Sequence, residues 1–263
     1  MANMGDRLAG KVALVFGAGS SGERVSNGRA AALTFAREGA KVAAIDVDAD
    51  QARRTAKEIT AEGGSAVALT ADVTAEDQVQ AAVGAAEELL GTPSVLHNNV
   101  GFAQMGDLTE LGLRDWQAAL DINVTSMFLT CKHVVPRMVT AGGGAIVNVS
   151  SVAAIRAVGY SYPGYSAAKA AVNQLTVSLA LRYARDGVRV NAVVPGLIDT
   201  PMVTNQVASG EESQRRRDEA SPTGRMGSPW DVAAAALYLA SDEAAYVNAV
   251  ALAVDGGLSQ RCV

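Results

Sequence analysis

Cysteine, basic charge and long apolar runs are all scarce in this sequence, and each scarcity excludes a class of protein. The two cysteines, Cys131 and Cys262, lie far apart without metal-ligand spacing, so we expect neither a disulfide nor a metal site. Lysine and arginine number 22 against 27 acidic residues, for a net charge of −5. The one notable basic run, 215–217, lies in a polar stretch, 209–221, that we interpret as a mobile loop, a helix or a solvated face. Nucleic acid is therefore not an expected partner.

No apolar run is long enough to cross a bilayer, because charged residues or glycine-rich turns interrupt each one. The first residues contain Asp6 and no long apolar core ahead of Lys11, so they lack the layout of a signal peptide. No stretch has the composition of a linker, and 263 residues with 49% hydrophobic content suffice for one domain spanning 1–263. These features predict a soluble, cytoplasmic protein that does not bind membranes.

Short apolar runs rich in β-branched residues alternate with alanine-rich segments of helical period. Most runs are apolar on both faces, and the segments between the first six are long enough to be crossover helices. This pattern predicts an α/β fold: a doubly wound, seven-stranded, mainly parallel sheet with helices on both faces, in a Rossmann-like three-layer sandwich. The runs are KVALVF at 11–16, KVAAIDV at 41–47, SAVALTADV at 65–73, SVLHNNV at 94–100, GAIVNVSS at 144–151, VRVNAVVP at 188–195 and ALAVDGG at 251–257.

The stretch GAGSSGERVSNGRAAA at 17–32 has the glycines of a phosphate-binding turn between a strand and a helix. Glycine lets backbone N–H groups approach a phosphate, and the positive end of a helix stands behind it. The G-x-G-x-x-G signature is met at 17–22, but Glu23 to Asn27 intervene before Gly28. We expect Asn27 to cap the helix 28–38, with Gly39 ending it. The stretch is either a lengthened cofactor loop or a plain surface loop.

An acidic residue after the next strand bears on the cofactor. Asp46 is placed to accept hydrogen bonds from an adenosine ribose and to repel a 2′-phosphate, which favours NAD over NADP. A turn role for Asp46 is the alternative. Arg24 and Arg29 keep NADP open as the less favoured cofactor, because either residue has the chemistry to bind a phosphate.

Nearly the whole chain resembles the short-chain dehydrogenase/reductase family in its one-domain form. The resemblance rests on motifs in a fixed order: the glycine turn, Ala-Asp-Val at 71–73, Asn-Asn-Val-Gly at 98–101, Asn-Val at 123–124, Asn-Val-Ser-Ser at 148–151, Tyr-Ser-Ala-Ala-Lys at 165–169, Pro-Gly-Leu-Ile-Asp-Thr at 195–200 and Val-Asp-Gly-Gly at 254–257.

The resemblance implies a role for each matching residue. Tyr165 would donate a proton to a carbonyl or accept one from an alcohol, assisted by Lys169, Ser151 and Asn123. Tyr165 and Lys169 would also contact the cofactor. The remaining cofactor-binding residues would be Gly17, Ser20, Asn27 and Gly28 at the phosphates, Asp46 at the ribose, Asp72 and Val73 by the adenine, Asn99 and Gly101 under the cofactor, and Pro195, Ile198 and Thr200 around the nicotinamide.

The chain departs from the family pattern at the phosphate loop. The family's threonine before the first glycine is Phe16, and its tight G-x-x-x-G-x-G turn is interrupted by an insert at 21–26. The family's Asn-Asn-Ala-Gly is also Asn-Asn-Val-Gly, with bulkier Val100 beside the cofactor. Because Gly17 and Gly28 still match at the two ends, we interpret the insert as a lengthened loop.

The catalytic set has a physical rationale beyond the resemblance. A free tyrosine has a pKa near 10 and is a poor base at neutral pH, whereas a nearby cation favours the phenolate. Residues four apart share a helix face, so Lys169 is expected beside Tyr165 and should lower its pKa. Ser151 can donate a hydrogen bond to the substrate oxygen, with Ser150 as its rival. Asn123 lies in a long helical stretch and is predicted to hold a water that links Lys169 to solvent, the alternative being an amide satisfied by backbone.

The prediction is an oxidoreductase that passes a hydride between NAD(H) and a secondary alcohol or ketone. The alternatives are a 3-oxoacyl-thioester reductase using NADPH and a cofactor-binding sensor without turnover on the same fold. The substrate, expected to be apolar or cyclic, would lie against 102–105, 152–164 and a covering segment at 201–221, where Ala153, Ile155, Val158, Tyr160, Tyr162, Met202 and Val203 are the apolar candidates. The family usually forms dimers or tetramers, so a homo-oligomer built on the helices 116–139 and 166–185 is expected.

Overall fold

All seven predicted strands form and pair in a single sheet. The computed structural model describes residues 5–22, 24–157, 159–203 and 210–261. The sheet has the order β3-β2-β1-β4-β5-β6-β7, and every neighbouring pair is parallel, which confirms the doubly wound fold. The strands are β1 Val12–Phe16, β2 Lys41–Asp46, β3 Ser65–Thr70, β4 Val95–Asn98, β5 Gly144–Val149, β6 Val188–Pro195 and β7 Ala251–Val254.

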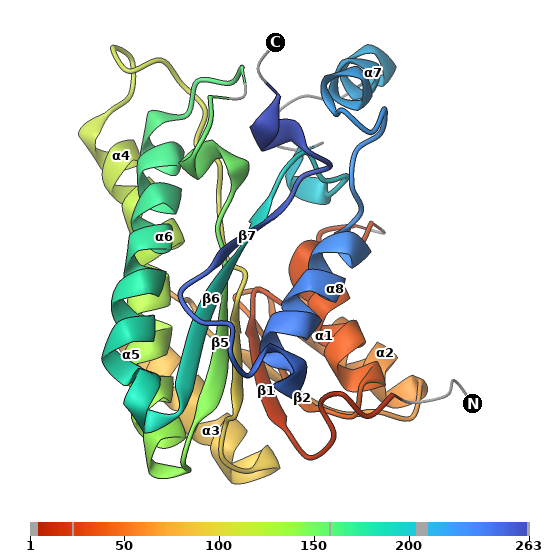
Figure 1. The fold of residues 1–263 in the computed structure, drawn as a ribbon, viewed down its shortest axis with the longest axis vertical. Coiled ribbons are helices and arrows are strands. Elements are labelled where there is room, and N and C mark those ends of the chain that lie inside the picture. Colours follow the sequence, from red (N-terminus) through yellow and green to blue (C-terminus); the bar gives the residue numbers. More distant parts are fainter. Residues whose placement is uncertain (1–4, 23, 158, 204–209, 262–263) are drawn as a thin grey trace.

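Helices cover both faces of the sheet and make three layers (Figure 1). On one face α1 packs against both α2 and α8, and on the other α3 packs on α5 while α4 packs on α6. The elements are α1 Asn27–Arg37, α2 Ala49–Ala61, α3 Glu76–Leu90, α4 Leu113–Leu120, α5 Ser126–Thr140, α6 Pro163–Tyr183, α7 Glu211–Ala220 and α8 Pro229–Ala240. Among the described residues, no helix is long and apolar enough to span a membrane.

The central strand shows why the apolar runs carry no polar face. Every residue of β1 is buried, because successive side chains point to opposite faces and helices cover both. Ala13 and Val15 join the apolar cluster beneath α1 and α8. Val12, Leu14 and Phe16 join the cluster beneath α3 and α5. Phe16, which stands where the family has threonine, is therefore a core residue.

Two helix starts illustrate local control by capping. The cap of α1 is Ser26 rather than the predicted Asn27, since the Ser26 hydroxyl accepts a hydrogen bond from the backbone N–H of Arg29 at 3.1 Å. Helix α8 begins at Pro229, after a reciprocal capping box between Ser228 and Asp231.

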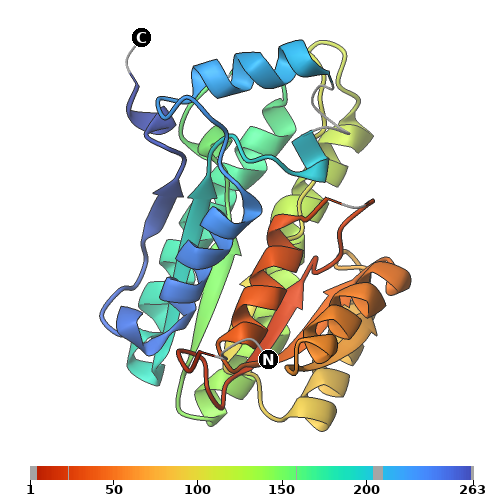
Figure 2. The ribbon, with the colours of Figure 1, turned by 90° about the vertical axis from the view of Figure 1, so that its right-hand side faces the viewer.

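The strand order fixes where a ligand can bind. The chain runs outward from β1 through β2 to β3, then returns to the other side of β1 with β4, so the order reverses between β1 and β4. The loops after these two strands diverge at the carboxyl edge and leave a crevice. Helix α7 lies across the top of this edge in Figure 2.

Candidate active site

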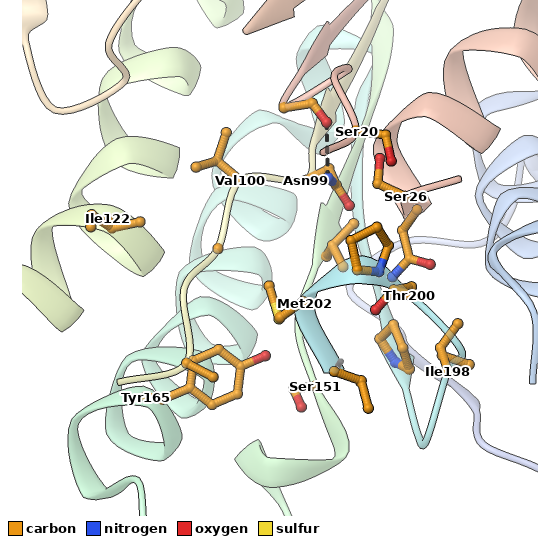
Figure 3. A pocket seen from close by; sticks show the side chains of 18 of the residues that line it. Ser20, Ser26, Asn99, Val100, Ile122, Ser151, Tyr165, Ile198, Thr200 and Met202 are labelled. Atoms are coloured by element: carbon orange, nitrogen blue, oxygen red, sulfur yellow. Dashed lines mark hydrogen bonds between the residues drawn. The ribbon is translucent and has the colours of Figure 1, made fainter. Parts of the chain in front are cut away.

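One cavity of about 540 Å³ opens at the carboxyl edge of the sheet. Its lining includes every residue predicted for the site except Asn123 and Gly28. In Figure 3, Tyr165, Ser151 and Met202 lie at one end of the cavity, whereas Ser20 and Ser26 lie at the other. The predicted residues that line it are Gly17, Ser20, Asn27, Asp46, Asp72, Val73, Asn99, Gly101, Ser151, Tyr165, Lys169, Pro195, Ile198 and Thr200.

Tyr165 and Lys169 stand one turn apart on the buried face of α6. The Lys169 ammonium lies 5.6 Å from the centroid of the Tyr165 ring and donates a 2.8 Å hydrogen bond to the carbonyl of Val149. Burial lowers the pKa of Lys169 to about 7. Burial also raises the pKa of Tyr165, and a hydrogen bond from the Ser151 hydroxyl opposes that rise. The sequence predicted that Lys169 lowers the pKa of Tyr165, but the net shift of the Tyr165 pKa is upward, because burial favours the neutral form of each group.

The two adjacent serines have different surroundings. Ser151 shares a hydrogen bond with Tyr165 and accepts one from the backbone N–H of Ala153 at 3.2 Å, which caps a short 3-10 turn at Val152–Ala154. The Ser150 hydroxyl instead donates to the carbonyl of Lys169 at 3.2 Å and is buried. Ser150 therefore ties the end of β5 to α6, and Ser151 is the serine whose hydroxyl meets Tyr165.

Asn123 occupies a π-helical turn, Asp121–Thr125, that interrupts the expected long helix between α4 and α5. Its side chain is fully buried and does not line the cavity. The amide nitrogen donates to the carbonyls of Phe102 and Ala119, both at 2.9 Å, and the amide oxygen accepts from the Phe102 N–H at 3.1 Å. These bonds hold the loop after β4 against the helix. The side chain thus has the backbone partners of the alternative interpretation, and the predicted water-holding role stays a prediction.

Gly28 lies behind the cavity wall and allows a close approach. A Cβ atom at Gly28 would stand 1.9 Å from the carbonyl oxygen of Gly17 and 2.6 Å from the Asn99 amide nitrogen. Asn99 itself donates to the Gly17 carbonyl at 3.1 Å. Only glycine fits where α1 meets the first turn of the loop, so Gly28 acts by shaping the cradle rather than by lining it.

The lengthened loop is anchored at both ends and along its length. Within it, Ser26 donates to the carbonyl of Gly19 at 2.6 Å, and Ser20 donates to the carbonyl of Arg24 at 2.5 Å. Arg54 of α2 donates to the Gly22 carbonyl at 2.7 Å. Arg24 forms a 2.6 Å ion pair with Asp199, which follows β6. Glu23 lies outside the described residues. The described residues of the insert therefore form an ordered strap, and Ser20, Ser21 and Ser26 face the cavity.

Asp46 performs two tasks at the end of β2. One carboxylate oxygen accepts the N–H of Gly19 at 2.8 Å, and the other accepts the N–H of Asp48 at 3.1 Å. A carboxylate offers about four acceptor positions, so two remain for ribose hydroxyl groups. Asp72 is also partly used, because it accepts the backbone N–H and the hydroxyl of Thr74 at 2.8 and 2.7 Å.

Two glycines bring the backbone close to charged side chains that line the cavity. A Cβ at Gly101 would stand 3.0 Å from the Asn123 oxygen and 3.1 Å from the Lys169 ammonium. A Cβ at Gly19 would stand 2.7 Å from the Asp46 carboxylate. Glycine at these positions therefore lets the backbone approach Asp46 in one part of the cavity and Lys169 in another. No group of three metal-ligating side chains occurs among the described residues.

The substrate end has apolar walls. Tyr160 and Tyr162 stack with ring centroids 6.0 Å apart, and Tyr162 meets Tyr165 edge-on at 5.4 Å. Met202 lines the cavity near them. Of the other predicted substrate residues, Val203 lines the cavity, whereas buried Ala153 and 43% exposed Ile155 do not. Val158 lies outside the described residues.

Several lining residues were not expected from the sequence. Ser26 and Gln51 face the cofactor end, and Ile122 lies on the side of Val100. Arg217 also lines the cavity, as part of the segment 201–221 expected to cover the substrate, although a solvated face was one interpretation of the basic run. Three consecutive residues of a helix point in directions about 100° apart, and the sequence does not say which of the arginines at 215–217 faces inward.

Comparison with known proteins shows which family this chain resembles. A family model described as enoyl-(acyl carrier protein) reductase matches residues 23–259. A cis-4-hydroxycyclohexanecarboxylate dehydrogenase of Sinomonas cyclohexanicum is 41% identical over 97% of this chain and 98% of its own. A 2,5-dichloro-2,5-cyclohexadiene-1,4-diol dehydrogenase of Sphingobium indicum is 39% identical, with 97% and 99% covered. A 3-oxoacyl-(acyl-carrier-protein) reductase of Thermotoga maritima is 38% identical, with 96% and 99% covered.

Solved structures agree with these relatives. A putative short-chain dehydrogenase/reductase from Burkholderia xenovorans is 44% identical and superimposes with a TM-score of 0.93, covering 98% of this chain and 100% of that one. A 7α-hydroxysteroid dehydrogenase complexed with NADH and 7-oxo glycochenodeoxycholic acid is 33% identical with a TM-score of 0.89, covering 97% and 96%.

The chain belongs to the short-chain dehydrogenase/reductase family. It is an NAD(P)-dependent oxidoreductase of the alcohol dehydrogenase type. The predictions of the family, of the fold, and of hydride transfer between a secondary alcohol and a ketone are confirmed.

Proposed function

We propose that the protein uses NAD(H) to interconvert a secondary alcohol on an apolar ring and the corresponding ketone. The observation that carries this proposal is the hydrogen-bonded pair of Ser151 and Tyr165, with Lys169 beside the tyrosine, at the apolar end of a cavity whose other end holds Asp46. The ring-shaped substrates named for the relatives, a hydroxycyclohexane carboxylate and a chlorinated cyclohexadiene diol, support the same substrate class.

The protein's own residues handle the proton and the oxygen. The Ser151 hydroxyl donates a hydrogen bond to the substrate oxygen and stabilises the charge that develops there. Tyr165 gives its phenolic proton to a carbonyl oxygen, or takes the hydroxyl proton from an alcohol. The bound nicotinamide ring would supply or accept the hydride.

Lys169 supplies the positive charge that favours the phenolate form of Tyr165. Because burial raises the pKa of Tyr165, the phenolate requires a nearby cation to form during alcohol oxidation. Lys169, with a pKa of about 7, supplies that charge when protonated, and its remaining ammonium protons can reach a cofactor ribose. Gly101 and Asn123 keep this part of the cavity open and rigid.

The proposed preference for NAD over NADP rests on the charges at the ribose end. The Asp46 carboxylate would repel a 2′-phosphate at the position where it binds ribose hydroxyls. Neither arginine that kept NADP open lines the cavity. Arg24 is paired with Asp199, and Arg29 is buried against Glu58. Bound NADH in the steroid dehydrogenase structure agrees with this preference.

A titration followed by NADH and NADPH fluorescence tests the cofactor assignment. The wild type should bind NADH more tightly than NADPH. Asp46→Asn should reduce the ratio of the NADPH and NADH dissociation constants by roughly 10-fold. Asparagine keeps an acceptor for Gly19, so the loop is preserved while the charge is removed. Asp48→Asn is the matched control, because it removes a neighbouring carboxylate that also lines the cavity. An unchanged preference in Asp46→Asn would refute the assignment.

Turnover separates the enzyme from the two alternative functions. NAD-linked oxidation of cyclohexanol-type alcohols supports the proposal. Faster reduction of a 3-oxoacyl thioester with NADPH than oxidation of these alcohols would favour the reductase. The Thermotoga maritima relative is named for that activity. Cofactor binding without turnover of either class would favour a sensor.

We also propose a homo-oligomer that uses the layer formed by α4, α5 and α6 (Figure 1). Large apolar side chains are exposed on these helices: Leu113 on α4, Phe128 on α5 and Leu181 on α6. Burying them between copies would remove apolar surface from water. Light scattering of the purified protein should give a multiple of the 27.0 kDa chain mass, and a monomeric mass would refute the proposal.

A further inference from the structure

Helix α7 carries three consecutive arginines with different surroundings. Arg215 and Arg216 are exposed, and Arg216 pairs with Glu212 at the surface. Arg217 is only 4% exposed and lines the cavity. Its Nη1 donates a 2.9 Å hydrogen bond to the Ser213 hydroxyl one turn earlier, which helps to hold the guanidinium in place. The helix therefore places one fixed cation on the cavity wall.

The position of this cation along the cavity points to the substrate. Among the described lining residues, the acidic side chains are Asp46, Asp48 and Asp72, and they follow β2 and β3 at the adenosine end. Arg217 comes from α7, which lies across the top of the carboxyl edge of the sheet (Figure 2) and follows β6 along the chain, as does Met202 beside the cluster of Tyr162 and Tyr165. The substrate end thus has positive charge and apolar walls without a lining carboxylate.

The two cations of the cavity have different tasks. Lys169 lies under Tyr165 and donates to the Val149 carbonyl, so it serves the reacting end. The Arg217 guanidinium is a planar fork with five N–H donors, a geometry that matches both oxygens of a carboxylate. Because the guanidinium is buried, such a charge-assisted pair is strong, and a neutral group of the same shape gains much less.

We propose that Arg217 determines specificity by binding a carboxylate on the substrate, so that the preferred substrates are ring alcohols that also carry an anionic group. This proposal rests on the proposed function, since Ser151 and Tyr165 define the reacting end. The apolar walls formed by Tyr160, Tyr162 and Met202 would contact the ring between the hydroxyl and the carboxylate.

Matched substrates and variants test this assignment. The probes are 3- and 4-hydroxycyclohexanecarboxylate and the corresponding carboxamides, which have nearly the same shape without the charge. The wild type should favour the carboxylates in kcat/KM by roughly 10- to 100-fold. Arg217→Met should lose that preference through a higher KM for the carboxylates, with the carboxamides little affected. Arg217→Lys should keep part of the preference, and Arg215→Met, on the same helix, should behave as the wild type.

A binding measurement separates this proposal from the proposed function. Each carboxylate is titrated into the enzyme–NADH complex and followed by nucleotide fluorescence, which needs no turnover. Tighter binding of carboxylate than carboxamide in the wild type, absent in Arg217→Met, supports the proposal even if no alcohol is oxidised. Equal binding of both probes, or weaker NADH binding by Arg217→Met, would overturn it, the latter by assigning Arg217 to the cofactor. Failure to oxidise any alcohol while NADH binds would count against the proposed function alone.

Discussion

Replacing Lys169 with methionine should stabilise the protein at neutral pH while abolishing its activity. Lys169 is 1% exposed, and burial lowers its pKa from the ordinary 10.5 to about 7. At pH 7 the unfolded chain holds the proton fully and the folded chain holds it about half the time, so this ionisation costs the folded state about 4 kcal/mol. Methionine removes this cost but leaves the Val149 carbonyl without its donor, which costs about 1–3 kcal/mol. The net gain at pH 7 should be about 1–3 kcal/mol.

The pH dependence distinguishes this cause from better packing. The folded pKa lies below the unfolded one, so between pH 7 and 10.5 the unfolded chain binds more protons and the stability of the wild type rises with pH. At pH 9.5 the cost should fall to about 1 kcal/mol. The advantage of Lys169→Met should therefore shrink by about 3 kcal/mol between pH 7 and 9.5 and reverse its sign.

Urea unfolding at pH 7 and 9.5, followed by tryptophan fluorescence, measures the stability difference between Lys169→Met and the wild type at each pH. Lys57→Met removes an exposed lysine of α2 and serves as the control, with a stability difference that does not depend on pH. A Lys169→Met variant that is less stable than the wild type at pH 7, or whose difference stays constant to pH 9.5, would refute the reasoning. NADH binding should persist in the variant, whereas alcohol oxidation should fall by at least roughly 100-fold.

Three further predictions concern other parts of the molecule. Tyr165→Phe should reduce kcat by at least roughly 100-fold with little change in NADH affinity, because only the proton-transfer group is removed; activity near the wild-type rate would exclude Tyr165 as the acid or base. Gly28→Ala should abolish cofactor binding, measured by fluorescence, since its Cβ would stand 1.9 Å from the Gly17 carbonyl, whereas Gly84→Ala in α3 meets nothing within 4 Å and should be neutral or stabilising. Burial lowers the pKa of His97 to about 4, so between pH 6.5 and 4 the unfolded chain takes up the proton and stability falls as the pH drops. In urea unfolding, the free energy of unfolding should fall between pH 7 and 4.5 by about 2 kcal/mol less in His97→Leu than in the wild type. An equal fall in both proteins would show that another group causes the loss of stability.

The strands and much of the site could be predicted because their signals are local. A strand buried on both faces needs an unbroken apolar run, and all seven runs formed strands. Parallel strands bring their carboxyl ends to one edge, so polar residues that follow the runs, such as Asp46 and Ser151, lie near that edge, and they line one cavity. The spacing of Tyr165 and Lys169 fixes their shared helix face through the 3.6-residue period.

Features that depend on distant contacts were missed or incomplete. Arg24 and Asp199 are far apart in sequence, so nothing in the loop itself indicates that it pairs with the segment after β6. The π-helical turn at Asn123 coincides with a hydrogen bond between its amide and the backbone of the loop after β4, a distant contact that helical periodicity does not report.

The sequence alone determined the order of strands and helices along the chain, the glycines where the backbone must pass close, and the tyrosine, lysine and serine proposed to carry the chemistry. These properties follow from periodicity, side-chain volume and chemical type, all of which are local. Only the tertiary structure decided which of three adjacent arginines is buried, which way the pKa of Tyr165 moves, and how the lengthened loop is held. Burial and charge environment are set by elements that converge from the whole chain, and no short stretch of sequence contains them.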